Sequence, residues 1–224
     1  MSRAVVLLSG GLDSATCLLI ARREGLGVFA LSLDYGQRHR LELDRAGALA
    51  SRYGAAAHRI ARLDFPGEGA SALTDPAIPV PLGSAGSDAI PITYVPARNT
   101  LFLAHALAWG EVVGASDIFI GANARDYSGY PDCRGDYLES FEKTANLGTR
   151  AGREGRPFRI RAPLLALAKR EIVLLAAELG LDFSLTSSCY RPARSGEPCG
   201  RCDACRFRSK GFAEAGLRDP LTSI

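Results

Sequence analysis

The stretch that decides the fold is AVVLLSGGLDS at residues 4–14. Its apolar first half, residues 4–8, predicts a buried strand, and residues 15–24 predict a helix that a glycine ends. Between them, Gly10 and Gly11 allow backbone angles that a side chain would forbid and let a ligand approach closely. The unpaired N–H groups of the first helical turn point to the same place. This order predicts a phosphate site; the alternative is that the glycines serve turn geometry alone.

Length and composition place the chain among ordinary globular proteins. It has 224 residues, 47% hydrophobic and 23% charged, enough for one large domain or one domain with a small appendage. The net charge of +3 comes from 27 basic and 24 acidic residues without a basic block, so no nucleic-acid partner is expected. No apolar stretch approaches the roughly 20 residues that span a bilayer, and residues 1–3 run directly into the first strand. We therefore expect a cytoplasmic protein with no membrane partner.

Strand and helix patterns alternate along the chain. Further strands are expected at residues 27–33, 57–60, 117–121 and 158–161, and helices at 43–53, from about 100 onward, at 136–146 and at 172–179. This alternation predicts parallel strands with right-handed crossovers, a Rossmann-like α/β fold. Ligands of such sheets bind at the carboxyl ends of the strands, where residues 34–39 and 122–134 lie. Residues 64–91 lack periodicity and are expected to be a lid, a binding loop or disordered.

One predicted helix carries a histidine on a face that is otherwise apolar. Leu101, Ala104, His105 and Ala108 share this face at helical spacing. Two interpretations of His105 remain open, a packed histidine and a catalyst, and the first is favoured. We therefore expect this face to be the buried one.

Four of the six cysteines are crowded near the C-terminus. Cys199, Cys202 and Cys205 form two overlapping C-x-x-C units, and Cys189 lies ten residues upstream. Four thiolates at this spacing can close a tetrahedron around zinc, a structural site with no open position. The competing interpretation is a redox C-x-x-C pair, which needs no third or fourth cysteine. Cys17, within an apolar helix, is expected to be a core residue.

Several motifs agree in type and order with one known family. The glycine loop lacks both the Walker lysine and the G-x-G-x-x-G spacing, and its SGGLDS sequence resembles the PP-loop of ATP pyrophosphatases. With it, the chain resembles the 7-cyano-7-deazaguanine synthase (QueC/ExsB) family of queuosine biosynthesis nearly end to end. The segments that carry this resemblance are residues 9–14, 34–39, 94–99, 126–134, 188–190, 199–205 and 210–212.

The resemblance implies an ATP-dependent ligase. Its substrates would be 7-carboxy-7-deazaguanine, ATP and ammonia, and its product the nitrile 7-cyano-7-deazaguanine, formed through an adenylated carboxylate, an amide and an adenylated amide. Mg²⁺ would accompany ATP, and one structural Zn²⁺ per chain would occupy the cysteine cluster. The implied architecture is a PP-loop (adenine nucleotide alpha hydrolase-like) domain at residues 1–185 with a helical zinc-binding segment at 186–224 packed on it. A homodimer is compatible with the sequence.

The resemblance and the positions at strand ends together assign site residues. For catalysis we expect Asp13, Arg98 and Lys169, because the departing pyrophosphate must be held and its charge neutralised. For ATP we expect Leu8, Ser9, Gly10, Gly11, Leu12, Asp13, Ser14, Tyr35, Gln37 and His39. For the flat deazapurine and its carboxylate we expect Arg98, Asn99, Tyr130, Asp132 and Arg134, in and near the loop at 127–134. The alternative for the loop residues is that they only order the loop.

Two other functions fit parts of this pattern. A PP-loop enzyme that thiolates tRNA would need a catalytic cysteine outside the zinc cluster, for which only Cys17 and Cys133 remain, and a basic RNA-binding face. A zinc-binding module on a nucleotide-binding scaffold would need no catalysis at all. Turnover with ATP, ammonia and the carboxylated deazapurine separates the three.

Overall fold

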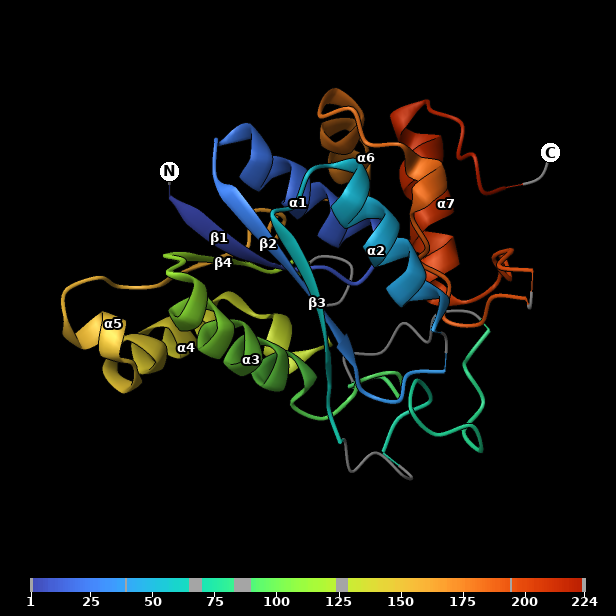
Figure 1. Ribbon diagram of the computed structural model, residues 1–224. Coiled ribbons are helices and arrows are strands. Elements are labelled where there is room, and N and C mark those ends of the chain that lie inside the picture. The colour runs from blue at the N-terminus through green and yellow to red at the C-terminus, as the bar shows by residue number, and fades with distance from the viewer. Residues whose placement is uncertain are drawn as a thin grey trace.

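A five-stranded parallel sheet forms the centre of the molecule (Figure 1). The computed structural model describes residues 2–38, 40–64, 70–82, 90–123, 129–193 and 195–222. The strand order is β3-β2-β1-β4-β5, and every neighbouring pair is parallel. The strands are β1 (Arg3–Leu7), β2 (Gly27–Asp34), β3 (Ala57–Arg62), β4 (Asp117–Phe119) and β5 (Arg159–Arg161). The predicted parallel α/β fold is therefore confirmed.

Helices cover both faces of the sheet (Figure 1). One face carries α1 (Leu12–Arg23), α2 (Leu41–Arg52) and α6 (Lys169–Glu178), with α7 (Asp203–Ala215) packed on α6. The other carries α3 (Arg98–Val113), α4 (Gly135–Gly148) and the short α5 (Arg150–Arg153). Two 3₁₀ turns, η1 (Pro131–Cys133) and η2 (Phe183–Leu185), complete the elements of the described residues.

The central strand β1 explains why two hydrophobic cores form. Successive side chains of a strand point to opposite faces, so a strand covered on both sides must be apolar throughout. Ala4 and Val6 belong to the core under α1, α2 and α6, whereas Val5 and Leu7 belong to the core under α3 and α4. The unbroken apolar run of the sequence thus reflects burial on both faces.

The strand order reverses next to β1, and this reversal places the glycine loop. β2 and β3 lie on one side of β1, while β4 returns on its other side. Gly121, just after β4, approaches α1 so closely that an added Cβ would lie 3.0 Å from the backbone nitrogen of Ser14. The loop after β1 and the segment after β4 therefore meet at the crevice where ligands of such sheets bind.

The C-terminal segment packs closely against the α/β body. Gly211 of α7 lies against Lys169, since an added Cβ would be 2.4 Å from Lys169 Cγ. The Phe212 ring is buried and meets the Phe183 ring edge to face at 4.8 Å between centroids. A buried ion pair between Arg208 Nε and an Asp219 carboxylate oxygen, 2.7 Å apart, ties the end of the chain to α7.

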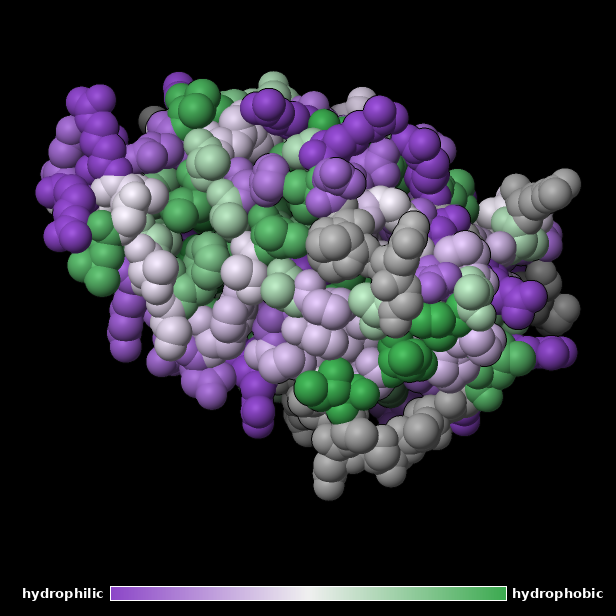
Figure 2. Space-filling model, turned by 90° about the horizontal axis from the view of Figure 1, so that it is seen from below, coloured by the Kyte–Doolittle hydropathy of each residue, from purple (hydrophilic) through white to green (hydrophobic). Residues whose placement is uncertain are grey.

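The face assigned to α3 from its sequence is wrong. The helix buries Leu103, Ala106 and Gly110 against the sheet, while the side that carries His105 faces outward. Val112, on α3, is 82% exposed. α3 lies on the lower side of the molecule in Figure 1. Figure 2 shows this side of the surface, on which hydrophobic and hydrophilic residues are mixed. His105 is thus neither a packed nor a cavity residue.

No helix of the described residues is long and apolar enough to cross a bilayer.

Candidate functional site

A cavity of about 240 Å³ opens at the carboxyl ends of β1, β2 and β4. Its lining joins the glycine loop, the turn after β2, the start of α2, the start of α3 and the segment before the cysteine cluster. Of the residues predicted for the site, the lining includes Leu8, Ser9, Gly11, Leu12, Asp13, Ser14, Tyr35, Gln37, Arg98, Asn99, Tyr130 and Lys169.

The glycine loop is held in shape by its own serines. The hydroxyl of Ser14 donates to the carbonyl oxygen of Gly11 at 3.0 Å and accepts from the backbone N–H of Ser9 at 3.1 Å. Gly10 has φ +84°, and a Cβ there would lie 2.3 Å from the carbonyl oxygen of Glu42, so only glycine fits. This geometry aims the N-terminus of α1, which begins at Leu12, into the cavity.

A carboxylate and an ammonium meet at the first turn of α1. Lys169 Nζ donates to both carboxylate oxygens of Asp13, at 3.0 and 2.9 Å. The two side chains are only 10% and 19% exposed, and they are contributed by α6 and α1, 156 residues apart. Within this neutral pair the Lys169 ammonium lies in the same cavity as the N–H groups of the helix terminus, an arrangement suited to an anionic ligand.

The turn after β2 closes one side of the cavity. The Gln37 side chain folds back on the strand end, accepting from the N–H of Tyr35 at 2.9 Å and donating to the carbonyl oxygen of Leu33 at 3.1 Å. Arg38 reaches over residues 70–82 and donates to three carbonyl oxygens there. His39, predicted for the ATP site, lies outside the described residues.

Arg98 is the cation on the opposite side of the cavity. Its guanidinium carbon lies 5.9 Å from the ring centroids of Tyr35 and Phe102, and Nη1 donates to the Tyr35 hydroxyl at 3.4 Å. Its buried Nε has no hydrogen-bond partner within the described part of the chain. The preceding Ala97 has φ 52°, an unusual angle for a residue other than glycine. Arg98 therefore lines the cavity and carries a buried donor that no described residue satisfies.

Asp132 acts within the protein rather than on the cavity wall. One of its carboxylate oxygens accepts the backbone N–H of Asn99 at 3.0 Å, which satisfies a free donor at the start of α3. The Asn99 side chain in turn donates to the Asp132 carbonyl oxygen and to the Cys133 sulfur. Asp132 is absent from the cavity lining, and so is Arg134, which is exposed. Residues 124–128 lie outside the described part of the chain.

Tyr130 does face the cavity from this loop. Its hydroxyl is hydrogen-bonded to the Thr93 hydroxyl at 2.7 Å, and its ring lies 5.9 Å from that of Tyr94. Burial raises the pKa of Tyr130, so the hydroxyl stays protonated and the ring offers a flat apolar surface.

Sequence reasoning missed several lining residues. Glu42 lies at the start of α2, and Ser187, Ser188 and Tyr190 flank Cys189, the first residue of the cysteine cluster. The N–H of Ser187 donates to the Gly10 carbonyl oxygen at 2.9 Å, which joins this segment to the glycine loop. The only signal for Glu42 was its place shortly after a strand end, in the first turn of a helix.

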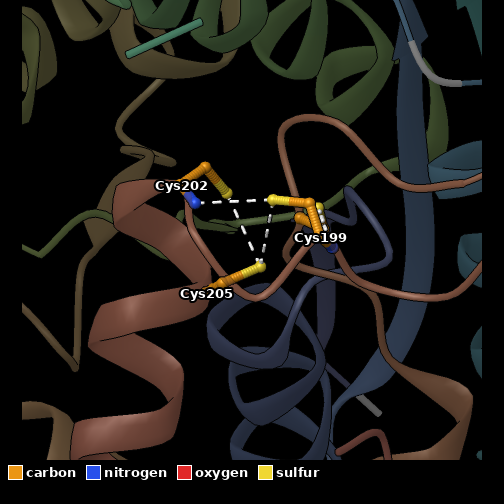
Figure 3. A group of neighbouring side chains, drawn as sticks. Cys199, Cys202 and Cys205 are labelled. Atoms are coloured by element: carbon orange, nitrogen blue, oxygen red, sulfur yellow. Dashed lines mark hydrogen bonds between the residues drawn. The ribbon is translucent and has the colours of Figure 1, made fainter. Parts of the chain in front are cut away.

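The four clustered cysteines form a candidate metal centre. Their sulfur atoms all lie within 4.8 Å of one another, with Cys202 and Cys205 at 3.5 Å and Cys199 and Cys205 at 4.0 Å. Zn–S bonds of about 2.3 Å in a tetrahedron separate the sulfurs by about 3.8 Å, so the donor set fits zinc. The sulfur atoms of the labelled cysteines point toward one another from the start of α7 and the loop before it (Figure 3).

Backbone N–H groups surround these sulfur atoms. Cys189 Sγ accepts from Arg191 and Cys199, Cys199 Sγ accepts from Arg201 and Cys202, and Cys202 Sγ accepts from Tyr190. Such donors stabilise thiolates, the form that binds metal.

A parallel sheet with the SGGLDS loop at its switch point defines an α/β protein of the PP-loop class. A family model described as queuosine biosynthesis protein QueC matches residues 3–216, and the chain belongs to this family.

Similar proteins extend over nearly the whole chain. A "7-cyano-7-deazaguanine synthase" from Pseudomonas savastanoi pv. phaseolicola is 58% identical over 97% of this chain and 94% of its own length. One of the same name from Anaeromyxobacter dehalogenans is 59% identical over 97% of this chain and 94% of its own length. Among solved structures, an NMN synthetase from Francisella tularensis covers 97% of this chain and 78% of its own chain at 16% identity, with a TM-score of 0.49.

Proposed function

We propose that this chain is an ATP-dependent ligase that converts 7-carboxy-7-deazaguanine and ammonia into 7-cyano-7-deazaguanine, with release of AMP and pyrophosphate. Relatives that are 58% and 59% identical over almost the full chain carry the name of this activity. The structural observation that carries the proposal is the Asp13–Lys169 pair at the N-terminus of α1, in the same cavity as the unused donor of Arg98.

ATP binds with its phosphates on the glycine loop. The N–H groups at the start of α1 receive the phosphate oxygens, and Lys169 adds a full positive charge close to them. Mg²⁺, when bound, supplies further charge, and Asp13 is the carboxylate that would hold it; this fits the preference of Mg²⁺ for one or two carboxylates plus phosphate oxygens. Tyr35 and Gln37 form the wall on the adenosine side.

The deazapurine lies across the cavity from the phosphates. Its carboxylate binds the Arg98 guanidinium, whose planar donors suit two carboxylate oxygens. Its ring lies against Tyr130. Asp132 and Asn99 hold the start of α3, and so position Arg98 rather than contact the ring.

The reaction then runs through two activations. A carboxylate oxygen attacks the α-phosphorus of ATP, and the bond to pyrophosphate breaks with its electron pair leaving on pyrophosphate. Positive charge from Lys169 and the helix terminus stabilises that departure. Ammonia displaces AMP to give the amide. A second ATP adenylates the amide oxygen, and loss of AMP together with the nitrogen-bound protons leaves the nitrile.

The cysteines outside the cluster support this function over a tRNA thiolase. Cys17 is fully buried in the core, which raises its pKa strongly. Cys133 lines the cavity, but burial and the nearby Asp132 raise its pKa to about 11. Neither thiol ionises appreciably near neutral pH, so neither is an activated nucleophile.

We further propose that residues 186–224 form a zinc-stabilised segment packed on the PP-loop domain at 1–185. This segment supplies Phe212 to the shared core and places Gly211 against Lys169. Zinc on the four cysteines would then stabilise this segment and, through Gly211, help to hold Lys169 in place.

The test is turnover of the zinc-loaded protein with ATP, ammonium and 7-carboxy-7-deazaguanine. We expect a nitrile product, with AMP and pyrophosphate in equal amounts. ADP and phosphate, or no nitrile, would refute the proposal. ATP consumption that is independent of the deazapurine would instead favour a nucleotide-binding module.

A further inference from the structure

The proposed reaction needs a proton acceptor. Ammonia attacks through its lone pair, but near neutral pH most of it is ammonium, in which a proton occupies that pair. Among the described residues that line the cavity, the carboxylates are Asp13 and Glu42, and no histidine is present. Both oxygens of Asp13 are bonded to Lys169. Glu42 is therefore the carboxylate that remains available.

Glu42 has a fixed place beside the glycine loop. Its carbonyl oxygen lies so close to Gly10 that an added Cβ there would be 2.3 Å from it, so α2 begins directly beside the loop. Its side chain makes no hydrogen bond or ion pair with any part of the chain that the structure describes. Glu42 lines the cavity and is only partly buried, so its carboxylate is open to a ligand there.

The charges around Glu42 come from several elements. Arg98 of α3 faces it, and Tyr35 of the turn after β2 interacts with it electrostatically. Asp44 and Arg45 are its charged neighbours on α2. The other titratable or charged groups of the cavity lining are Asp13, Arg38, Tyr130, Cys133, Lys169, Tyr190 and Arg208.

This environment suits a base. Burial raises the pKa of Glu42 to about 7, against the opposing attraction of Arg98. A general base works best with a pKa near the operating pH, whereas an ordinary glutamate is too weak. Arg98 and Glu42 share the cavity without an ion pair between them, which leaves space for the substrate carboxylate and the incoming nitrogen.

We propose that Glu42 is a catalytic residue that binds ammonium and takes a proton from it before the nitrogen attacks the adenylated carboxylate. The proton passes from nitrogen to a Glu42 oxygen, which frees the lone pair. That pair forms the C–N bond, and the C–O bond to AMP breaks with its electrons leaving on AMP. The second proton lost by nitrogen leaves on the AMP phosphate. The inference rests on the proposed function and deepens it.

The test compares Glu42→Gln with the wild type in two assays. The overall reaction needs ammonium, whereas exchange of labelled pyrophosphate into ATP, driven by the deazapurine carboxylate, does not. In the variant we expect kcat/KM for ammonium to fall about 100-fold or more, and the exchange rate to fall far less. Asp44→Asn, an exposed carboxylate on the same helix, is the matched control.

The pH dependence supplies a second readout. Wild-type kcat/KM for total ammonium should rise to about pH 7 and then level off. Without the base, only free ammonia reacts, so the Glu42→Gln rate should keep rising about tenfold per pH unit. Hydroxylamine is uncharged near pH 7 and can replace ammonium as the nucleophile. With hydroxylamine, the loss of kcat/KM caused by Glu42→Gln should be at least tenfold smaller than with ammonium.

The outcomes separate this inference from the proposed function. Equal loss of exchange and overall turnover in Glu42→Gln, or a wild-type profile that does not level off, overturns the role of Glu42. Failure of the wild type to catalyse either reaction would instead refute the proposed function.

Discussion

Replacement of Gly211 by alanine should disturb the active site from outside the cavity. Gly211 lies inside α7, where alanine normally stabilises a helix by about 0.5–1 kcal/mol. Here the new Cβ would lie 2.4 Å from Cγ, 3.0 Å from Cβ and 3.2 Å from the carbonyl carbon of Lys169. The first distance falls about 1 Å short of normal contact, so α7 or Lys169 must shift.

This overlap lowers both the stability of the variant and its reaction rate. Overpacking of this kind costs about 1–3 kcal/mol, which outweighs the helix gain and leaves the variant about 1 kcal/mol less stable. The 2.9 and 3.0 Å hydrogen bonds from Lys169 to Asp13 must lengthen as well. A displacement of about 1 Å in a catalytic group can cost on the order of 100-fold in rate. We expect kcat for AMP formation to fall about 10- to 100-fold.

Gly47→Ala is the matched control. Gly47 also lies inside a helix, α2, but the nearest atoms to an added Cβ are 3.8 Å away, on the His58 ring. We expect this variant to be as stable as the wild type or slightly more, with unchanged kcat. Urea unfolding gives the stabilities, and AMP release gives the rates. If Gly211→Ala matches Gly47→Ala in both, the contact between α7 and Lys169 has no role in positioning that residue.

Three further variants test other parts of the site. Lys169→Met should lower kcat by about 10²–10³ because it removes the charge beside the departing pyrophosphate, while the exposed Lys210→Met should not; equal effects would contradict this. Cys202→Ser should give substoichiometric zinc and faster proteolysis around residues 186–215, and full zinc content with wild-type resistance would reopen the redox interpretation. Glu42→Gln should gain stability over the wild type as pH rises, by about 2 kcal/mol between pH 5 and 8, because the raised pKa of about 7 means that the folded state disfavours the charge. A gain that is independent of pH would contradict that shift.

The sheet and the loop could be predicted because local sequence determines them. The run at residues 4–8 is apolar on both faces and leads into Gly10, which no other residue can replace. The four cysteines were equally recognisable, because metal ligation requires their spacing, and the structure brings the sulfur atoms together.

The buried face of α3 could not be predicted because the helix is apolar on both sides. Leu103 and Ala106 are buried, yet Leu101 and Val112, on the other side, are just as hydrophobic. Periodicity ranks faces by polarity, so it cannot choose between two apolar ones.

Tertiary contacts account for the remaining differences. Asp132 looked like a substrate ligand, but its carboxylate accepts the N–H of Asn99, 33 residues earlier in the chain. Glu42 belongs to no recognisable motif, and Arg98, whose charge acts on it in the cavity, lies far along the chain. Neither partner is near enough in sequence for a local pattern to reveal it.

The central claim is that ATP activates the substrate carboxylate by transfer of its adenylyl group. The most direct measurement uses 7-carboxy-7-deazaguanine with both carboxylate oxygens replaced by ¹⁸O, followed by mass spectrometry of the nucleotide products. Each oxygen lost on the way to the nitrile should leave on AMP, so every AMP should carry one ¹⁸O atom and pyrophosphate should carry none. ¹⁸O in inorganic phosphate, or unlabelled AMP with the label released to water, would contradict adenylation.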